Sequence, residues 1–132
     1  MRRMLHPLAL CLLLSACKQQ LSGDANLQKQ LTGTWSSWWG GGSLTNVTTV
    51  SADGHYSRIG VGTNGMVLAR CEGVLKVQDG CLVDTMTKHS EPNVPLPYTN
   101  RAAIVRAGDR EWALKRYSSE KNETILLRKE SR

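Results

Sequence analysis

The sequence lacks the features that identify several common functional classes. The apolar stretch near its start, Pro7 to Ala16, is too short for a transmembrane helix, which needs roughly 20 apolar residues. The sequence contains no Gly-x-Ser-x-Gly or His-Glu-x-x-His motif. Its glycine run, residues 40–42, lacks the Lys and the Ser or Thr of a phosphate-binding loop. These absences weigh against a membrane-spanning protein and against common enzyme classes, so we expect a non-catalytic role.

Histidines and clustered basic residues are also scarce. His6 lies in the N-terminal segment, which leaves His55 and His89 without paired ligand spacing, so neither a metal site nor a cofactor is expected. The formal net charge is +6, but the basic residues are spread along the chain and interleaved with acids. A nucleic-acid groove concentrates basic residues with stacking aromatics, so nucleic acid is not an expected partner.

The N-terminus has the pattern of an export signal. Arg2 and Arg3 precede the apolar stretch, whose length suits a signal peptide. The next four residues, Leu14-Ser15-Ala16-Cys17, resemble the lipobox of bacterial lipoproteins. That resemblance implies removal of residues 1–16 and attachment of a diacylglycerol to Cys17. Acyl chains contribute about 0.8 kcal/mol for each buried CH₂, which makes the lipid a stable membrane anchor. The alternative is an ordinary secretory signal whose cleavage region contains Cys17.

The residue after the cysteine indicates a location. Asp at that position favours the inner membrane in the lipoproteins that this motif resembles, whereas this chain has Lys18. The resemblance therefore implies a bacterial envelope protein at the outer membrane, facing the periplasm. Residues 17–32 are expected to hold the lipidated cysteine and a polar tether, with a helical turn over 25–31 that Asp24 caps and Gly33 ends.

Residues 33–132 are expected to form one all-β domain. Asp53-Gly54 and Asp79-Gly80 are signals for two-residue hairpin turns. The first turn predicts Thr48 opposite Ile59 and Val50 opposite Ser57, and the second predicts Cys81 opposite Gln78 and Cys71 opposite Lys88.

A third hairpin is expected to turn at Gly108-Asp109, with Val105 opposite Trp112 and Arg106 opposite Glu111. Residues 88–99 hold three prolines and are expected to be a loop. The pattern predicts about seven or eight short antiparallel strands in an up-and-down meander, and closure into a barrel would protect its edges.

Gly33-Thr34-Trp35, entered from a short polar turn, resembles the Gly-x-Trp opening of lipocalin-like β-barrels. In that family the tryptophan packs at the closed end of the barrel beneath a basic residue from the last strand or just after it, a role open here to Arg128 or Arg116. The chain is shorter than a typical ligand-carrying lipocalin. It is more similar to the small lipocalin-like domains of bacterial lipoproteins, and side chains could fill its barrel.

Two residues stand out as binding candidates. Alternation places Trp35 and Trp39 on one face as core residues and Trp38 outside, where its ring could stack on a sugar or a lipid. Asp84 falls on the apolar face of its strand, where a carboxylate must either pair with an arginine or be rotated outward by a bulge.

Cys71 and Cys81 are the candidate disulfide. An oxidising periplasm favours the bond. The predicted register opposes it, because it separates the two residues along the ladder by over ~20 Å, against a usual Cα separation near 5.5 Å.

We therefore expect a non-catalytic, membrane-anchored lipoprotein that binds a small apolar ligand or an envelope protein. The alternative is a periplasmic inhibitor or assembly factor that acts through the exposed loop from Ser90 to Tyr98. A third possibility, from another class, is an envelope hydrolase accessory or weak enzyme, which a perturbed carboxylate beside a histidine in a cleft would support.

Overall fold

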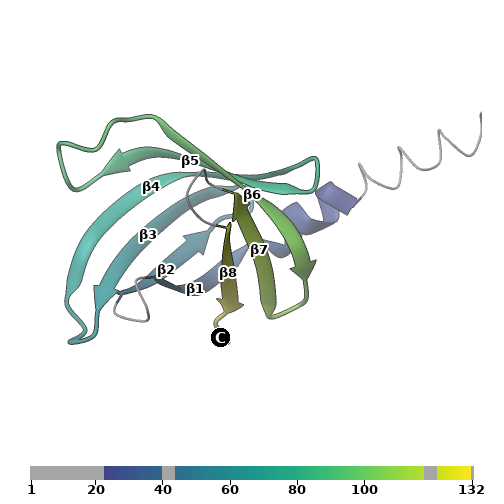
Figure 1. Cartoon of the computed structure of the whole chain (residues 1–132), viewed down its shortest axis with the longest axis horizontal. Helices are drawn as coiled ribbons and strands as arrows, with labels where there is room; N and C mark the ends of the chain where they lie inside the picture. Colours follow the sequence, from purple (N-terminus) through teal and green to yellow (C-terminus); the bar gives the residue numbers. More distant parts are fainter. Residues whose placement is uncertain (1–22, 40–43, 118–121, 132) are drawn as a thin grey trace, which may run out of the picture.

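The computed structural model describes residues 23–39, 44–117 and 122–131. Eight antiparallel strands form a closed up-and-down barrel in which every strand pairs with its neighbours in the chain and β1 also pairs with β8 (Figure 1). This confirms the all-β meander and the barrel closure expected from the hairpin signals, and the lipocalin-like architecture that the Gly33-Thr34-Trp35 resemblance implied. Residues 1–22, with the lipobox and Cys17, lie outside the described residues. The strands are β1 (Gly33–Trp39), β2 (Leu44–Val50), β3 (His55–Gly62), β4 (Val67–Gln78), β5 (Cys81–His89), β6 (Tyr98–Ala107), β7 (Glu111–Tyr117) and β8 (Asn122–Lys129).

A short helix over residues 23–30 lies against one end of the barrel. Asp24 is not the helix cap that the sequence suggests: its carboxylate accepts the backbone N–H groups of Asp79 and Gly80 at the β4–β5 turn. Gln28 donates to the carbonyl of Leu75 and accepts the N–H of Val77. These bonds fix the helix to β4 and close this end of the barrel. Within the described ranges no helix is long and apolar enough to cross a membrane.

The core is densest beneath the helix. Leu31, Trp35 and Trp112 are at most 3% exposed, and the two indole rings meet edge to face with centroids 5.6 Å apart. The Trp35 indole N–H donates to the carbonyl of Leu31 at 2.7 Å. Lys129 places its ammonium 5.2 Å from the centre of the Trp35 ring. The basic partner of Trp35 is therefore Lys129, and neither Arg128 nor Arg116 as expected.

The first hairpin differs from its predicted register by one residue. Ser51 and Gly54 form an i to i+3 turn, Ser51 also pairs with His55, and Gly54 has φ +89°. This is a three-residue connection with glycine in the left-handed region, where the sequence suggested a two-residue turn. The ladder consequently pairs Thr48 with Arg58. Since a shift of one residue exchanges the two faces of a strand, Arg58 points into the barrel.

The second hairpin has the predicted register, with Gln78 opposite Cys81. Asp79 and Gly80 both have positive φ, as this two-residue turn requires. A bulge between Glu72 and Gly73 then places Cys71 opposite His89 instead of Lys88.

The register of the third hairpin also differs from the predicted one. Trp112 lies opposite Ala107, and a bulge leaves Val105 64% exposed instead of facing Trp112. The predicted contact of Arg106 with Glu111 is nevertheless present, as an ion pair on the outer surface.

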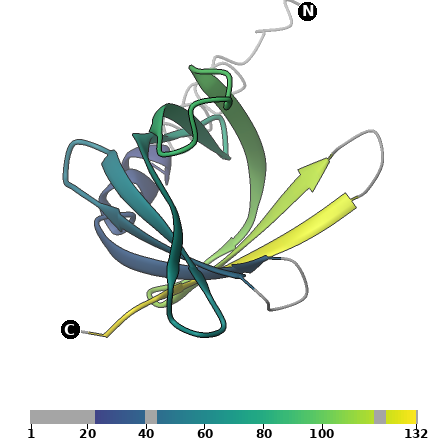
Figure 2. The same cartoon turned by 90° about the vertical axis from the view of Figure 1, so that its left-hand side faces the viewer.

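The end opposite the helix is open (Figure 2). β1 and β8 pair only at Trp35 and Ser36 of β1, and the ladder between β6 and β7 covers Ala103 to Ala107 of β6. The β7–β8 hairpin therefore diverges from both neighbouring strands, to the right in Figure 2. This divergence leaves room for a cavity inside the open end.

Candidate functional site

A cavity of about 320 Å³ lies at the open end of the barrel, with walls contributed by β2 to β7. A smaller space of about 80 Å³ lies deeper and has mainly apolar walls. The larger volume is at the lower limit of small-molecule sites, which typically occupy roughly 300–1,000 Å³. Four side chains line both spaces and so mark the level at which they meet: Asn46, Arg58, Asp84 and Asn100.

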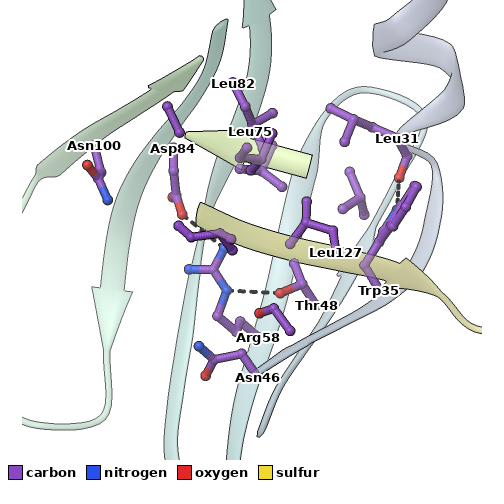
Figure 3. Close-up of a pocket in the computed structure, with 15 residues that line it drawn as sticks. Leu31, Trp35, Asn46, Thr48, Arg58, Leu75, Leu82, Asp84, Asn100 and Leu127 are labelled. Atoms are coloured by element: carbon purple, nitrogen blue, oxygen red, sulfur yellow. Dashed lines mark hydrogen bonds and ion pairs between the residues drawn. The ribbon is translucent and has the colours of Figure 1, made fainter. Parts of the chain in front are cut away.

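An ion pair crosses this level. The Nη2 of Arg58 lies 2.9 Å from Oδ2 of Asp84, and the two side chains are 19% and 23% exposed (Figure 3). Arg58 comes from β3 and Asp84 from β5, so the pair spans β4 inside the barrel. Asp84 therefore faces inward and pairs with an arginine, the first of the two arrangements expected from the sequence.

Two neighbouring hydroxyl groups complete the pair. Tyr56 donates its hydroxyl hydrogen to Oδ1 of Asp84 at 2.6 Å, and Arg58 Nε donates to Oγ1 of Thr48 at 2.9 Å. The Arg58 guanidinium also lies 4.5 Å from the centre of the Tyr56 ring. Gly73 makes room for this arrangement, because a Cβ there would lie 2.8 Å from the Tyr56 hydroxyl oxygen.

These contacts fix the ionisation of the site. Burial, followed by the hydrogen bond to Asp84, raises the pKa of Tyr56 far above its ordinary value of 10.0. Burial by itself lowers the pKa of Arg58, but the charge of Asp84, the Tyr56 side chain and the hydrogen bond to Asp84 outweigh burial and raise that pKa. The tyrosine is therefore neutral and the arginine charged over the physiological range.

Two asparagines flank the ion pair. Asn46 belongs to β2 and Asn100 to β6, which lie four strands apart in the eight-stranded barrel and so on opposite walls. Both side chains line the cavity, and neither amide has a hydrogen-bond partner among the described residues. Each amide offers a carbonyl oxygen as acceptor and an NH₂ group as donor.

A second ion pair stands nearer the mouth. Arg116 of β7 lies 2.6 Å from Glu123 of β8 and lines the cavity. His89 also lines it, and its Nδ1 accepts the backbone N–H of Glu91 at 3.0 Å. The cavity wall thus combines paired charges, neutral hydrogen-bonding groups and apolar surface, which is an arrangement suited to binding.

The tryptophans selected from the sequence do not lie together in the structure. Trp35 is buried and Trp38 is 46% exposed, as expected, and the Arg128 guanidinium lies 5.1 Å from the centre of the Trp38 ring. The side chain of Trp39 lies outside the described residues. Trp38 is on the outer surface and does not belong to the cavity, so its binding role stays a separate prediction.

Cys71 and Cys81 are both free thiols, so the candidate disulfide is not formed. Cys71 lines the cavity, whereas Cys81 follows the β4–β5 turn near the closed end. The antiparallel ladder keeps the two cysteines apart, because it pairs Cys81 with Gln78 while Cys71 lies far along β4. Burial raises the pKa of the Cys71 thiol, which keeps it protonated and weakly nucleophilic.

Asp84 and His89 both line the cavity, but no ion pair joins them in the described part of the chain. The carboxylate and histidine that do form an ion pair there belong to an exposed turn. His55 Nδ1 lies 2.9 Å from Asp53, and the side chains are 69% and 67% exposed. Hydrogen bonds from Ser51 and from the backbone of His55 lower the pKa of Asp53 to about 2. These contacts stabilise the β2–β3 turn, and Asp53 borders a surface hollow between this turn and the helix, outside the cavity at the open end.

Metal ligands do not gather in the described ranges, which contain no group of three or more His, Cys, Asp or Glu residues able to hold an ion. No protein-family model, curated protein or solved structure matches this chain. The geometry of the cavity is therefore the basis for a functional proposal.

Of the four side chains that line both spaces, sequence reasoning missed three: Arg58, Asn46 and Asn100. Arg58 was missed because the first hairpin was predicted with a two-residue turn. Asn100 was missed because it directly follows the segment expected to be a loop, residues 88–99, whereas β6 already begins at Tyr98. Asn46 shares the parity of Thr48 on β2, which is the one signal that could have placed it inside.

Proposed function

We propose that this protein is a lipid-anchored lipoprotein of the bacterial envelope that binds a small ligand, partly apolar and partly polar, in the open end of its barrel. The observation that carries the proposal is the cavity of about 320 Å³ around the Arg58–Asp84 pair. Apolar walls with a few convergent polar groups are typical of small-molecule sites. The purely apolar ligand expected from the sequence is less suitable, because it would cover polar groups without giving them partners.

Anchoring through Cys17 would orient this cavity. Five residues separate Cys17 from the helix that closes the barrel, a reach of at most about 20 Å at roughly 3.3–3.6 Å per residue. The closed end would therefore stay near the membrane, and the open end would face away from it. With Lys18 after the cysteine, we propose the outer membrane and a mouth directed into the periplasm.

The anchor is tested separately from the cavity. Radioactive palmitate should label the wild-type protein, and Cys17→Ser should abolish both the label and the membrane association. A Cys11→Ser variant is the matched control, since Cys11 lies within the segment proposed to be removed. Label retained by Cys17→Ser would refute the anchor while leaving the cavity proposal untouched.

The cavity is tested by native mass spectrometry of the protein purified from its own envelope. A bound small molecule, released by unfolding, is the expected result. Trp112 is buried beneath the helix and Asp84 lines the cavity, so Asp84→Leu should reduce occupancy without disturbing the closed end. A protein that carries no small molecule would contradict the proposed function.

A second candidate function is favoured by the apolar rim. Leu96 and Tyr98, at the end of the β5–β6 loop, are 40% and 51% exposed. Exposed apolar groups on a loop can contact a partner protein, as an inhibitor or assembly factor would require. Leu96→Glu should then release a stoichiometric envelope protein from the purified complex, while a cavity ligand would be retained.

A further inference from the structure

We propose that the cavity at the open end selects a ligand with an uncharged, hydrogen-bonding head group of the carboxamide class, in preference to a carboxylate or an ammonium group. This inference rests on the proposed ligand-binding function and names the chemistry of its ligand. The feature that leads to it is the pairing of the charges in the cavity wall.

The charge of Asp84 is already satisfied. One carboxylate oxygen accepts from Arg58 Nη2 at 2.9 Å and the other accepts from the Tyr56 hydroxyl at 2.6 Å. A ligand ammonium group would have to compete with this arginine, and a ligand carboxylate would meet a like charge at Asp84. Either charged head would also lose its hydration in a site where both side chains are about one-fifth exposed.

The remaining ionisable groups in the wall do not change this balance. Arg116 is paired with Glu123. His89 accepts a backbone N–H at Nδ1, so this nitrogen carries no proton in the arrangement seen. The wall therefore presents no uncompensated charge that would attract an ionic head group.

The cavity wall also carries neutral amides that lack partners. The amides of Asn46 and Asn100 make no hydrogen bond within the described ranges, and they lie on either side of the Arg58–Asp84 pair in Figure 3. Each can donate and accept at the same time. A carboxamide head has the same donor and acceptor, so it could bond to both walls without introducing charge.

The mouth of the cavity can accommodate a short apolar chain attached to the carboxamide head group. Leu44 and Met86 line the cavity beside Gly60. A Cβ on Gly60 would make ordinary van der Waals contacts with Oδ1 of Asn46 at 3.5 Å and with Cδ1 of Leu44 at 3.6 Å, and it would occupy space beside them in the cavity. The ligand would place its head at the ion pair and its chain toward the mouth.

The test compares three compounds that share one chain and differ in the head group: hexanamide, hexanoate and hexylamine. Cys71 lines the cavity, so bound compound should slow its modification by a small neutral thiol reagent. Cys81, outside the cavity, is the internal control thiol, and mass spectrometry separates the two rates. Hexanamide should protect Cys71 at concentrations about tenfold lower than either charged compound, a ratio equivalent to roughly 1.4 kcal/mol.

Two variants should reverse the preference. Asp84→Asn leaves Arg58 without its counter-ion and should make hexanoate the best of the three compounds. Arg58→Gln leaves Asp84 unpaired and should make hexylamine the best. Asp53→Asn, on the exposed β2–β3 turn, removes a carboxylate outside the cavity and should leave the order unchanged. The wild-type order decides the inference if a cavity variant does not fold.

The possible failures are distinguishable. If hexanoate or hexylamine protects wild-type Cys71 as well as hexanamide does, the head-group inference is wrong, but the cavity still binds small molecules. If none of the three compounds slows the reaction, the inference is also wrong. In that case the proposed function falls as well when native mass spectrometry finds no bound molecule.

Discussion

At the closed end of the barrel, Trp35 and Trp112 are almost fully enclosed, and each indole N–H has a backbone carbonyl partner. At the open end, the side chains of Arg58 and Asp84 are about one-fifth exposed. The amides of Asn46 and Asn100 there have no hydrogen-bond partner in the described part of the chain. One end thus satisfies its polar groups internally, whereas the other presents polar groups that a ligand could satisfy.

This difference indicates how a small barrel can combine stability with binding. Large aromatic side chains that exclude water contribute most of the favourable free energy of folding. Unpaired amides and an ion pair contribute less, because desolvation offsets much of their attraction. Stability should therefore depend mainly on the closed end and ligand binding on the open end. The following predictions test that division, from the largest expected effect to the smallest.

Trp112→Ala should lower the free energy of unfolding by about 3–5 kcal/mol, the usual cost of truncating a fully buried aromatic residue. Tyr98→Ala at the open rim is the matched comparison, because this aromatic side chain is 51% exposed. It should cost less than about 1 kcal/mol. Urea unfolding measures both values, and equal losses would break the proposed division.

Arg58→Met should cost about 1–3 kcal/mol, since it leaves the Asp84 carboxylate without its ionic partner inside the barrel. The double variant Arg58→Met/Asp84→Asn should recover most of that loss, because no unpaired charge remains. A double-mutant cycle gives the coupling free energy. Strictly additive losses would show that the pair does not act as a unit.

Tyr56 should make stability fall at alkaline pH. Burial and the hydrogen bond to Asp84 raise its folded-state pKa, so its contribution is complete below the unfolded pKa of about 10 and is lost as the pH rises further. Between about pH 9 and pH 11, the free energy of unfolding should decline more steeply for wild type than for Tyr56→Phe. Parallel curves for the two proteins would contradict the assignment.

Trp38→Ala should have the smallest effect, about 0.5–1 kcal/mol, because the side chain is half exposed and its main contact is the Arg128 guanidinium. Arg128→Ala should cost a similar amount, and the double variant should cost little more than either single change. A loss comparable with that of Trp112→Ala would mean that the outer face also supports the fold.

The strand order was predictable because turn signals are local. Asp79 and Gly80 both adopt positive φ, and the hairpin they form has the register expected from the sequence. The β2–β3 turn was less predictable, because the side chain of Asp53 accepts hydrogen bonds from Ser51 and from the backbone of His55 and stabilises a longer connection. Asp-Gly alone does not distinguish the two turn lengths.

That single residue of register explains much of what was missed at the site. With a two-residue turn, Ile59 pairs with Thr48; with the observed turn, Arg58 does. Asp84 was expected either to pair with an arginine or to be rotated outward by a bulge, and the sequence did not identify which arginine could be its partner. The outward rotation of Val105 was likewise hidden, since it results from a bulge inside β6.

The sequence by itself determined the all-β class, the succession of hairpins, the burial of Trp35 and the exposure of Trp38, because turn chemistry and strand alternation act over a few residues. The expected lipid anchor at Cys17 also rests on a local motif and stays a prediction. Only the tertiary structure decided which face of β3 points inward, that Lys129 covers Trp35, and that Arg58 meets Asp84 between two asparagines. Those contacts join distant strands, and their identity depends on turn length, bulges and barrel closure together.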